Sequence, residues 1–436
     1  MDQILISVFL IIALFAILAT GLWIGLGLVA CGWLAMMLFT NRPVGDAMMT
    51  TIFGSSTSWT LTALPMFIWM GEILFRTRLS EDMFRGLAPW MTRLPGRLVH
   101  TNVIGCTIFA AVSGSSAATC ATIGKMSIPE LRSRGYPENI VVGSLAGAGT
   151  LGLLIPPSLI MIVYGVAAEV SIAKLFIAGV IPGILLAALF MGYIVVWSLL
   201  NPDKIPQPTE KFSFVQKIWA SRHLLPTVGL ILAVLGSIYT GIATATEAAA
   251  LGVVGALVVS AAQGSLNVKT FMESLLGATR LSCMIGLILA GAAFLTLAMG
   301  FTGLPRHLAD WISSMGFSPA ALIVVLMVFY IVLGCFLDGI SMVVLTMAVV
   351  LPMIERAGID LIWFGIFVVL VVEMAQITPP VGFNLFVLQG MTGHQITYIA
   401  KVAFPFFLLM VAAVALIFFV PGLVTWLPSQ MLGPGG

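Results

Sequence analysis

The sequence predicts an all-α polytopic membrane protein built from two inverted-topology repeats, each with a re-entrant helical hairpin and a transmembrane helix broken at a Pro-Pro pair. Three observations predict this fold class: the apolar composition, the spacing of the apolar segments, and a set of prolines repeated at one offset. Of 436 residues, 60% are hydrophobic and only 8% are charged, whereas soluble domains carry about a quarter charged residues. This composition excludes a soluble enzyme, and a net charge of +2 provides no electrostatic footprint for nucleic acid.

Apolar stretches of about 20 residues are long enough to cross a bilayer, and the chain contains ten of them. They lie near residues 4–19, 22–40, 58–75, 138–167, 175–200, 224–239, 244–262, 281–300, 361–392 and 402–427. Two further apolar segments, hairpin one (98–124) and hairpin two (320–351), are interrupted in the middle by small polar residues. We expect these two to enter and leave the membrane on the same side.

The distribution of basic residues supports re-entrant hairpins. With both hairpins re-entrant, 15 of the 19 Lys and Arg residues lie in loops on one side, and four lie on the other. The positive-inside rule assigns the basic side to the cytoplasm. We therefore expect both termini on the opposite, periplasmic side.

Four prolines recur after 223 residues, which indicates an internal repeat. Pro129, Pro156, Pro157 and Pro182 have counterparts in Pro352, Pro379, Pro380 and Pro405. The predicted domains are a first repeat over 1–200, a cytoplasmic linker over 201–223 and a second repeat over 224–436. Each half has five crossings, an odd number, so the second half begins on the other side of the membrane. Inverted repeats of this kind are typical of secondary transporters, whose site lies at mid-membrane.

The sequence contains no nucleotide-binding or catalytic motif. No G-x-x-x-x-G-K-[ST] pattern is present, so we expect an ion gradient as the energy source. No Ser-His-Asp, H-E-x-x-H or paired-carboxylate arrangement appears either. The sequence therefore predicts a protein that is not an enzyme.

The middle of hairpin one carries a cluster of hydroxyl and glycine residues from Ser113 to Thr119. Hydroxyl oxygens and glycine carbonyls suit a monovalent cation, and the N–H groups of half-helix N-termini attract a carboxylate. Small residues in membrane helices also serve close packing. At a re-entrant tip we favour the binding role.

The paired prolines predict two interrupted helices. Pro156-Pro157 and Pro379-Pro380 each remove backbone donors and clash with the preceding turn. Lipid offers no hydrogen-bond partner, so the freed carbonyls are tolerated only where they line a cavity. Two such breaks at equivalent places in inverted halves point to a binding site.

Four acidic residues fall at membrane depth, where carboxylates are costly and usually functional. Asp338 lies at the tip of hairpin two and is the best candidate for a charged cation ligand or gate. Glu373 lies about a turn and a half before Thr378 and is expected to face the same break. For Glu72 and Glu247, nearer span ends, we favour a structural role.

These motifs resemble those of the large membrane subunit of TRAP (tripartite ATP-independent periplasmic) transporters, DctM-type, within the ion-transporter superfamily. The resemblance covers nearly the whole chain. It rests on AVSGSSAAT at 111–119, GLLIPPS at 152–158, ATEAAA at 245–250 and QITPPVGFN at 376–384. It implies an elevator-type, sodium-driven importer of organic acids, such as C4-dicarboxylates or sialic acids, in the bacterial inner membrane. It also implies a small four-helix DctQ-type membrane subunit and a periplasmic substrate-binding protein as partners.

The resemblance also implies at least two sodium ions. One would lie between hairpin one (Ser113, Gly114, Ser115) and the first broken helix (Gly149, Thr150, Pro156). The other would lie between hairpin two (Asp338, Gly339) and the second broken helix (Thr378, Pro379, Gly382). The substrate is expected beside them, at Ser116, Thr119, Pro157, Ser158, Pro380 and Asn384.

The main alternative is a stand-alone sodium- or proton-coupled carboxylate carrier or antiporter without a binding protein. Related dicarboxylate carriers have Ser-Asn-Thr at their hairpin tips, and this chain lacks that tripeptide. The departure disfavours the alternative, and it also means that the ligands of those carriers cannot be copied onto this sequence.

Overall fold

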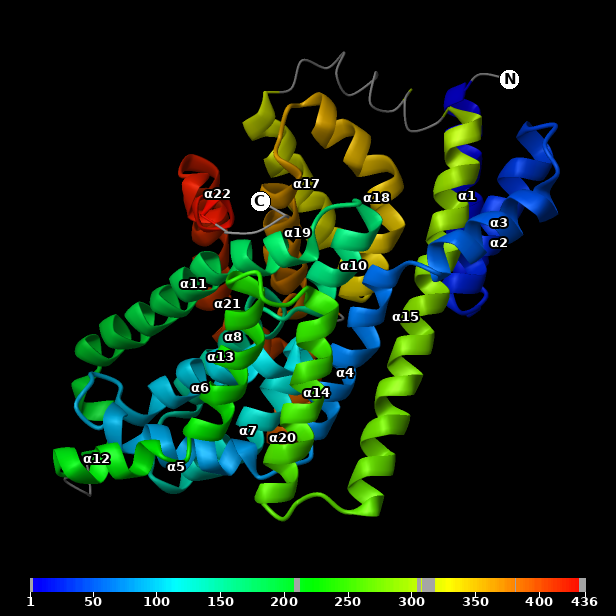
Figure 1. Cartoon of the computed structure of the whole chain (residues 1–436). Coiled ribbons are helices and arrows are strands. Elements are labelled where there is room, and N and C mark those ends of the chain that lie inside the picture. Colours follow the sequence, from blue (N-terminus) through cyan, green and yellow to red (C-terminus); the bar gives the residue numbers. More distant parts are fainter. Residues whose placement is uncertain (1–2, 208–211, 304–306, 308–317, 381, 431–436) are drawn as a thin grey trace.

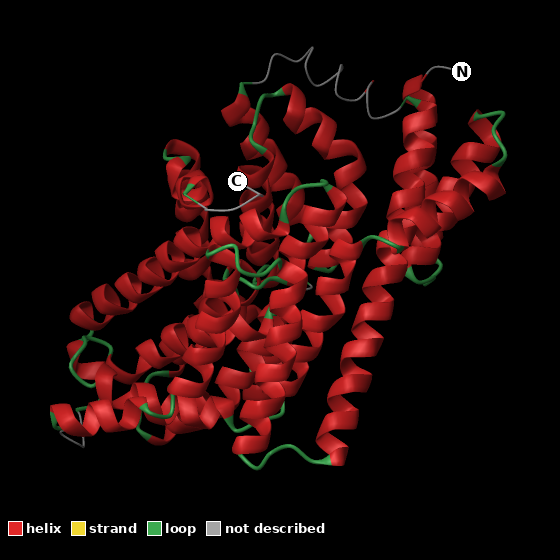
Figure 2. Cartoon of the chain, in the orientation of Figure 1, coloured by secondary structure: helices red, strands yellow, loops and turns green. Residues whose placement is uncertain are grey.

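The computed structural model describes residues 3–207, 212–303, 307, 318–380 and 382–430, and all regular elements among them are helices (Figure 2). The first half contains α1 (Gln3–Ala19), α2 (Ile24–Phe39), α3 (Val44–Ser56), η1 (Trp59–Thr62), α4 (Ala63–Phe75), α5 (Leu79–Met91), η2 (Arg97–Val99), α6 (His100–Ser113), α7 (Ser116–Ser133), α8 (Glu138–Gly149), α9 (Leu151–Leu154), α10 (Leu159–Ala167) and α11 (Ile172–Leu200). After η3 (Pro202–Lys204) and α12 (Phe214–Ser221) come α13 (Leu225–Tyr239), α14 (Ala245–Ala262), α15 (Val268–Thr302), α17 (Pro319–Leu333), α18 (Gly339–Arg356), α19 (Leu361–Gln376), α20 (Phe383–Thr392), α21 (Ile396–Phe419) and α22 (Gly422–Ser429).

Several helices are long and apolar enough to cross a membrane. Among the described residues these are α11, α14, α15, α18 and α21, and three bent helix pairs raise the number to eight. Of these, α18 belongs to the predicted hairpin two, and the others overlap predicted spans. α2 and α19 are shorter, at 16 residues each, or about 24 Å at 1.5 Å per residue.

Helices also extend into segments predicted as loops. The sequence predicts a loop over 263–280, but α15 begins at Val268 and runs for 35 residues. Asn267 starts this helix, because its side-chain oxygen accepts a hydrogen bond from the Thr270 amide at 2.8 Å. Polar residues mark where a helix leaves the hydrocarbon region, whereas the capping residue marks where the helix itself begins. The start predicted from hydropathy, near residue 281, is therefore later than the start of α15.

Helices from the basic segments and helices near the chain ends lie at opposite ends of the molecule. In Figure 1, α5 and α12, which form inside the two segments richest in basic residues (76–97 and 201–222), lie at the lower end, and α22 and the first turns of α1 lie toward the upper end. The terminal residues 1–2 and 431–436 themselves lie outside the described part.

Hairpin one is formed by α6 and α7, which turn at Gly114 and Ser115. The arms pack antiparallel: a Cβ added at Gly105 would lie 3.4 Å from the Ile123 side chain. Residues 98–124 therefore fold back on themselves. Hairpin two is formed by α17 and α18, whose arms are joined by a 2.7 Å hydrogen bond between Tyr330 Oη and Thr346 Oγ1. Hairpin one lies in the lower half of Figure 1 and hairpin two in the upper half.

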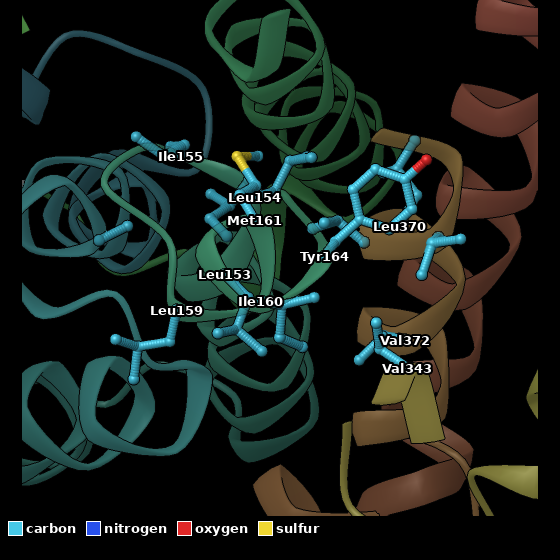
Figure 3. Packing of buried hydrophobic residues seen from close by; sticks show 14 of the residues in the cluster. Leu153, Leu154, Ile155, Leu159, Ile160, Met161, Tyr164, Val343, Leu370 and Val372 are labelled. Carbon is cyan, nitrogen blue, oxygen red and sulfur yellow. The ribbon is translucent and has the colours of Figure 1, made fainter. Parts of the chain in front are cut away.

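The helices of the two halves share one apolar core around the first broken helix. Ile160 and Tyr164 of α10 pack near Leu370 and Val372 of α19 and Val343 of α18 (Figure 3). Tyr164 Oη also donates a 2.7 Å hydrogen bond to the Leu361 carbonyl at the start of α19. The first half's interrupted helix is thus held by side chains from the second half.

Glycines allow α2 and α15 to pack backbone against backbone. A Cβ added at Gly25 would lie 2.7 Å from the Leu287 carbonyl oxygen, and one added at Gly291 would clash with the Gly25 carbonyl. Close approach through small residues is the usual way in which membrane helices associate. This contact joins the first three helices of the chain (α1, α2 and α3) to α15 of the second half.

We expect Gly291→Ala to lower the free energy of unfolding by about 1–3 kcal/mol, because the added methyl overpacks the α2–α15 contact. Gly286, on the same helix, is the matched control, since a Cβ there meets nothing within 4 Å. Gly286→Ala should not destabilise, because alanine favours helix over glycine. Thermal unfolding of the detergent-solubilised protein, followed by tryptophan fluorescence, measures both. Equal melting temperatures for the two variants would contradict the packing.

Candidate functional site

The tip of hairpin one is held by short-range hydrogen bonds of its own hydroxyl groups. α6 ends with Gly114 in the left-handed region at φ +60°, which a residue without Cβ adopts at no steric cost. Ser115 then caps α7, since its Oγ accepts from the Ala118 amide at 3.4 Å. Ser113 Oγ lies 2.7 Å from Thr119 Oγ1 across the turn.

This tip packs directly against the first broken helix. The Leu159 amide donates to the Gly114 carbonyl at 3.5 Å. A Cβ added at Gly152 would lie 2.6 Å from both the Ser115 carbonyl oxygen and Ser116 Cα. Glycine at 152 is what allows the two backbones to meet.

The helix is interrupted between Leu154 and Leu159. Ile155 is extended at φ −83° and ψ 123°, the Pro156-Pro157 peptide bond is cis, and Ser158 caps α10 by accepting from the Met161 amide at 3.3 Å. The residues of this break are all buried. The freed backbone groups therefore face protein, as the membrane requires.

Glu373 is the residue that the sequence interpretation placed wrongly. It was expected to face the break next to Thr378, but its Oε1 accepts hydrogen bonds from Ser116 Oγ at the tip of hairpin one and from the Leu153 amide, the latter at 2.8 Å. Glu373 is fully buried. An acid from the second half thus connects hairpin one and α9 of the first half.

Hairpin two meets the second broken helix in a comparable way. Asp338 caps α18: its Oδ2 accepts from the Ile340 and Ser341 amides at 3.1 and 3.2 Å, and its Oδ1 accepts from Ser341 Oγ. Cys335 Sγ donates to the Pro379 carbonyl at 3.2 Å. The hairpin-two tip and the break at Pro379 therefore lie side by side.

The second break folds tightly onto the helix that precedes it. Thr378 Oγ1 donates to the Met374 carbonyl at 2.7 Å, and the Pro379-Pro380 peptide bond is cis. A Cβ added at Gly382 would lie 2.7 Å from the Gln376 carbonyl oxygen. Pro379 and Pro380 are exposed, in contrast to the buried first pair.

Two further residues predicted for the site, Asn384 and Thr150, have different surroundings. Asn384 of α20 lies against the first half, since a Cβ added at Gly149 would be 3.1 Å from its amide nitrogen. Asn384 is fully buried, and its amide atoms have no hydrogen-bond partner in the described part of the chain. Thr150 points away from the hairpin: its hydroxyl bonds the Gly147 carbonyl at 2.6 Å and lies 3.8 Å from Met410 Sδ of α21.

The other two intramembrane acids stabilise helices. Glu72 of α4 forms an ion pair with Arg76 one turn later, next to Gly277 of α15. Glu247 forms a capping box at the start of α14, accepting from the Thr244 amide at 2.8 Å while the Glu247 amide donates to Thr244 Oγ1 at 3.3 Å. Neither lies at a hairpin tip or a proline break.

Contributors without a distinctive sequence signal complete the site. They are the Leu153 amide, the Ser341 hydroxyl and the Cys335 thiol. A backbone amide carries no side-chain signature, so it could not be found by motif. Ser341 stands three residues after Asp338, which is the spacing of a cap and its partner, and that spacing was the available clue.

Comparison with known proteins agrees with this architecture. Residues 11–423 match the family model of the tripartite ATP-independent periplasmic transporter, DctM component. The C4-dicarboxylate TRAP transporter large permease protein DctM of Pseudomonas aeruginosa is 31% identical over 92% of this chain and 93% of its own length. The isethionate TRAP transporter permease protein DctMQ of Oleidesulfovibrio alaskensis is 31% identical over 94% of this chain, which spans 64% of that protein.

A solved structure shares the fold. The crystal structure of the YdaH transporter of Alcanivorax borkumensis superimposes with a TM-score of 0.61 over 88% of this chain and 89% of that one, at 16% sequence identity. At that identity the likeness concerns the fold alone. From the family match and the relatives, the chain belongs to the DctM component family of tripartite ATP-independent periplasmic transporters.

Proposed function

We propose that this chain is the large transmembrane subunit of a sodium-gradient-driven importer of small organic acids that depends on a binding protein. One observation carries the proposal. Each of two interrupted helices lies against the tip of a helical hairpin, and both tips carry hydroxyl groups beside the break. Unwound carbonyls of this kind coordinate sodium, and half-helix N-termini bind carboxylates, in secondary transporters.

The proposed sodium sites follow the two contacts. The first comprises Ser113, Gly114 and Ser115 with the break at 155–158. The second comprises Asp338 and Gly339 with Thr378, Pro379 and Gly382. Ser116, Thr119 and Asn384 adjoin the first contact and would receive the organic acid, since the unpartnered amide of Asn384 can donate to a carboxylate.

We propose an elevator mechanism with inverted repeats. Hairpins in opposite halves of the molecule support it (Figure 1), as does the recurrence of prolines after 223 residues. The hairpins and broken helices would move together, because they are joined by hydrogen bonds and close backbone contacts. The contact of α2 with α15 would belong to the stationary part.

The proposed partners are a small DctQ-type membrane subunit and a periplasmic substrate-binding protein. The DctMQ name of one relative, of which this chain spans 64%, supports a second membrane component. The word periplasmic in the matching family description supports a bacterial inner-membrane location with the solute arriving from the periplasm. Both termini would then face the periplasm.

Uptake by reconstituted proteoliposomes tests the function. With the small subunit and the binding protein present, we expect accumulation of a C4-dicarboxylate, the solute named for one relative, only under an inward sodium gradient. The control is an equal potassium gradient at the same membrane potential. If the binding protein carries a different acid, that acid replaces the dicarboxylate. Uptake by the chain alone, or uptake that needs only a proton gradient, would favour the stand-alone carrier instead.

Substitutions of Asp338 can separate the effect of its charge on uptake from the effect of its helix cap on stability. Asp338→Asn keeps a good N-cap for α18 but removes the charge, so we expect at least a roughly tenfold loss of sodium-dependent uptake with an unchanged melting temperature. Asp338→Ala should lose uptake and also about 1 kcal/mol of stability with the cap.

The matched control is Asp360, which caps α19 by accepting from the Trp363 amide at 2.8 Å. It lies at the end of α19 that is remote from the break. Asp360→Asn should therefore retain normal uptake. Normal sodium-dependent uptake by Asp338→Asn would remove Asp338 from the second sodium site.

A further inference from the structure

One of the two carboxylate oxygens of Glu373 has no hydrogen-bond partner in the described part of the structure. The side chain is fully buried in α19. Both of its hydrogen bonds, from Ser116 Oγ and from the Leu153 amide, go to Oε1, and Oε2 has no partner. No Lys, Arg or His among the described residues forms an ion pair with it.

The surrounding helices compensate this charge only in part. Ser116 is the first residue of α7, and Leu153 belongs to the four-residue α9. A helix N-terminus supplies about half a unit of positive charge, and two neutral donors on one oxygen leave the other oxygen bare. A buried carboxylate is stable only when a counter-charge or a proton neutralises it.

We propose that Glu373 Oε2 is a direct ligand of a sodium ion at the tip of hairpin one, so that an acid of the second half completes the first ion site. This rests on the proposed function and adds the charged ligand that the site otherwise lacks. Two further oxygens lie on the same hairpin tip: the Ser115 carbonyl, which lies against Gly152, and Ser113 Oγ, 3.5 Å from that carbonyl. They would complete the proposed site, whose single negative charge comes from Glu373.

The arrangement has a consequence for transport. A carboxylate with one bound sodium ion is neutral, whereas the empty site leaves a buried charge that is expensive to carry through hydrocarbon. Sodium would also hold hairpin one, α9 and α19 together, since all three contribute to the cluster. Occupancy by sodium would therefore favour movement of the closed block.

Direct binding of radioactive sodium to the purified chain tests the ligand. Glu373→Gln keeps the acceptor for Ser116 and Leu153 but removes the charge. We expect it to bind one sodium ion fewer than the wild type, or to bind that ion roughly tenfold more weakly or worse. Glu247→Gln is the matched control: glutamine still completes the capping box, so sodium binding should be unchanged.

The outcomes separate this inference from the proposed function. Glu373→Gln with wild-type sodium stoichiometry and affinity would overturn the inference while sodium coupling stands. The same result with a lost pH dependence of uptake would mean that a proton, not sodium, occupies Oε2. Absence of sodium binding by the wild type would overturn the proposed coupling itself.

A measurement on the unmodified protein covers the case in which Glu373→Gln does not fold. Dicyclohexylcarbodiimide is an apolar reagent that couples to buried carboxyl groups. Sodium should slow its reaction with Glu373 several-fold, and potassium should not, as followed by mass spectrometry of the peptide that contains it. Labelling that is indifferent to sodium would overturn the inference.

Discussion

Where a helix is interrupted inside a bilayer, its backbone N–H and C=O groups lose their helical partners and find no water. The protein itself must then supply their hydrogen-bond partners. In this chain the constraint explains why hairpins and broken helices occur side by side. The Leu159 amide after the first break is satisfied by the Gly114 carbonyl, and the Leu153 amide before it by Glu373. At the second break the Pro379 carbonyl accepts from Cys335. The hairpin tips therefore supply part of the hydrogen bonding at both breaks, and they bring hydroxyl and carbonyl oxygens next to them.

The same contacts join the two halves of the chain. Glu373 and Asn384 follow the linker in sequence but lie against α7, α8 and α9 of the first half. Gly339 at the tip of hairpin two lies against α10 as well as α19, since a Cβ added there would be 2.9 Å from Ile160 and 2.5 Å from Val372. Each contact between a hairpin tip and a helix break therefore involves residues of both halves or lies against the other half. The two breaks also differ in access, since the first proline pair is buried and the second is exposed.

Much of the fold could be predicted because it follows from local chemistry. The proline pairs predicted interruptions, and helices end at Leu154 and Gln376. Ser113 to Ser116 predicted a turn, and the chain turns at Gly114. Helix ends in polar segments were less predictable, because hydropathy does not report where a backbone remains coiled. The 35 residues of α15 and the helices α3 and α5 are the examples.

The sequence by itself determined the class of protein, the places where helices break and the small polar residues available there. These depend on properties of single residues: transfer into lipid, the missing proline N–H and the freedom of glycine. Only the tertiary structure decided which groups meet. A residue five positions from Thr378 can face several neighbours, and the rotation of α19 about its axis, set by its packing against α9, α10 and α18, turned Glu373 toward hairpin one. The spacing of a motif does not determine that rotation, because the rotation depends on side chains hundreds of residues away in the sequence.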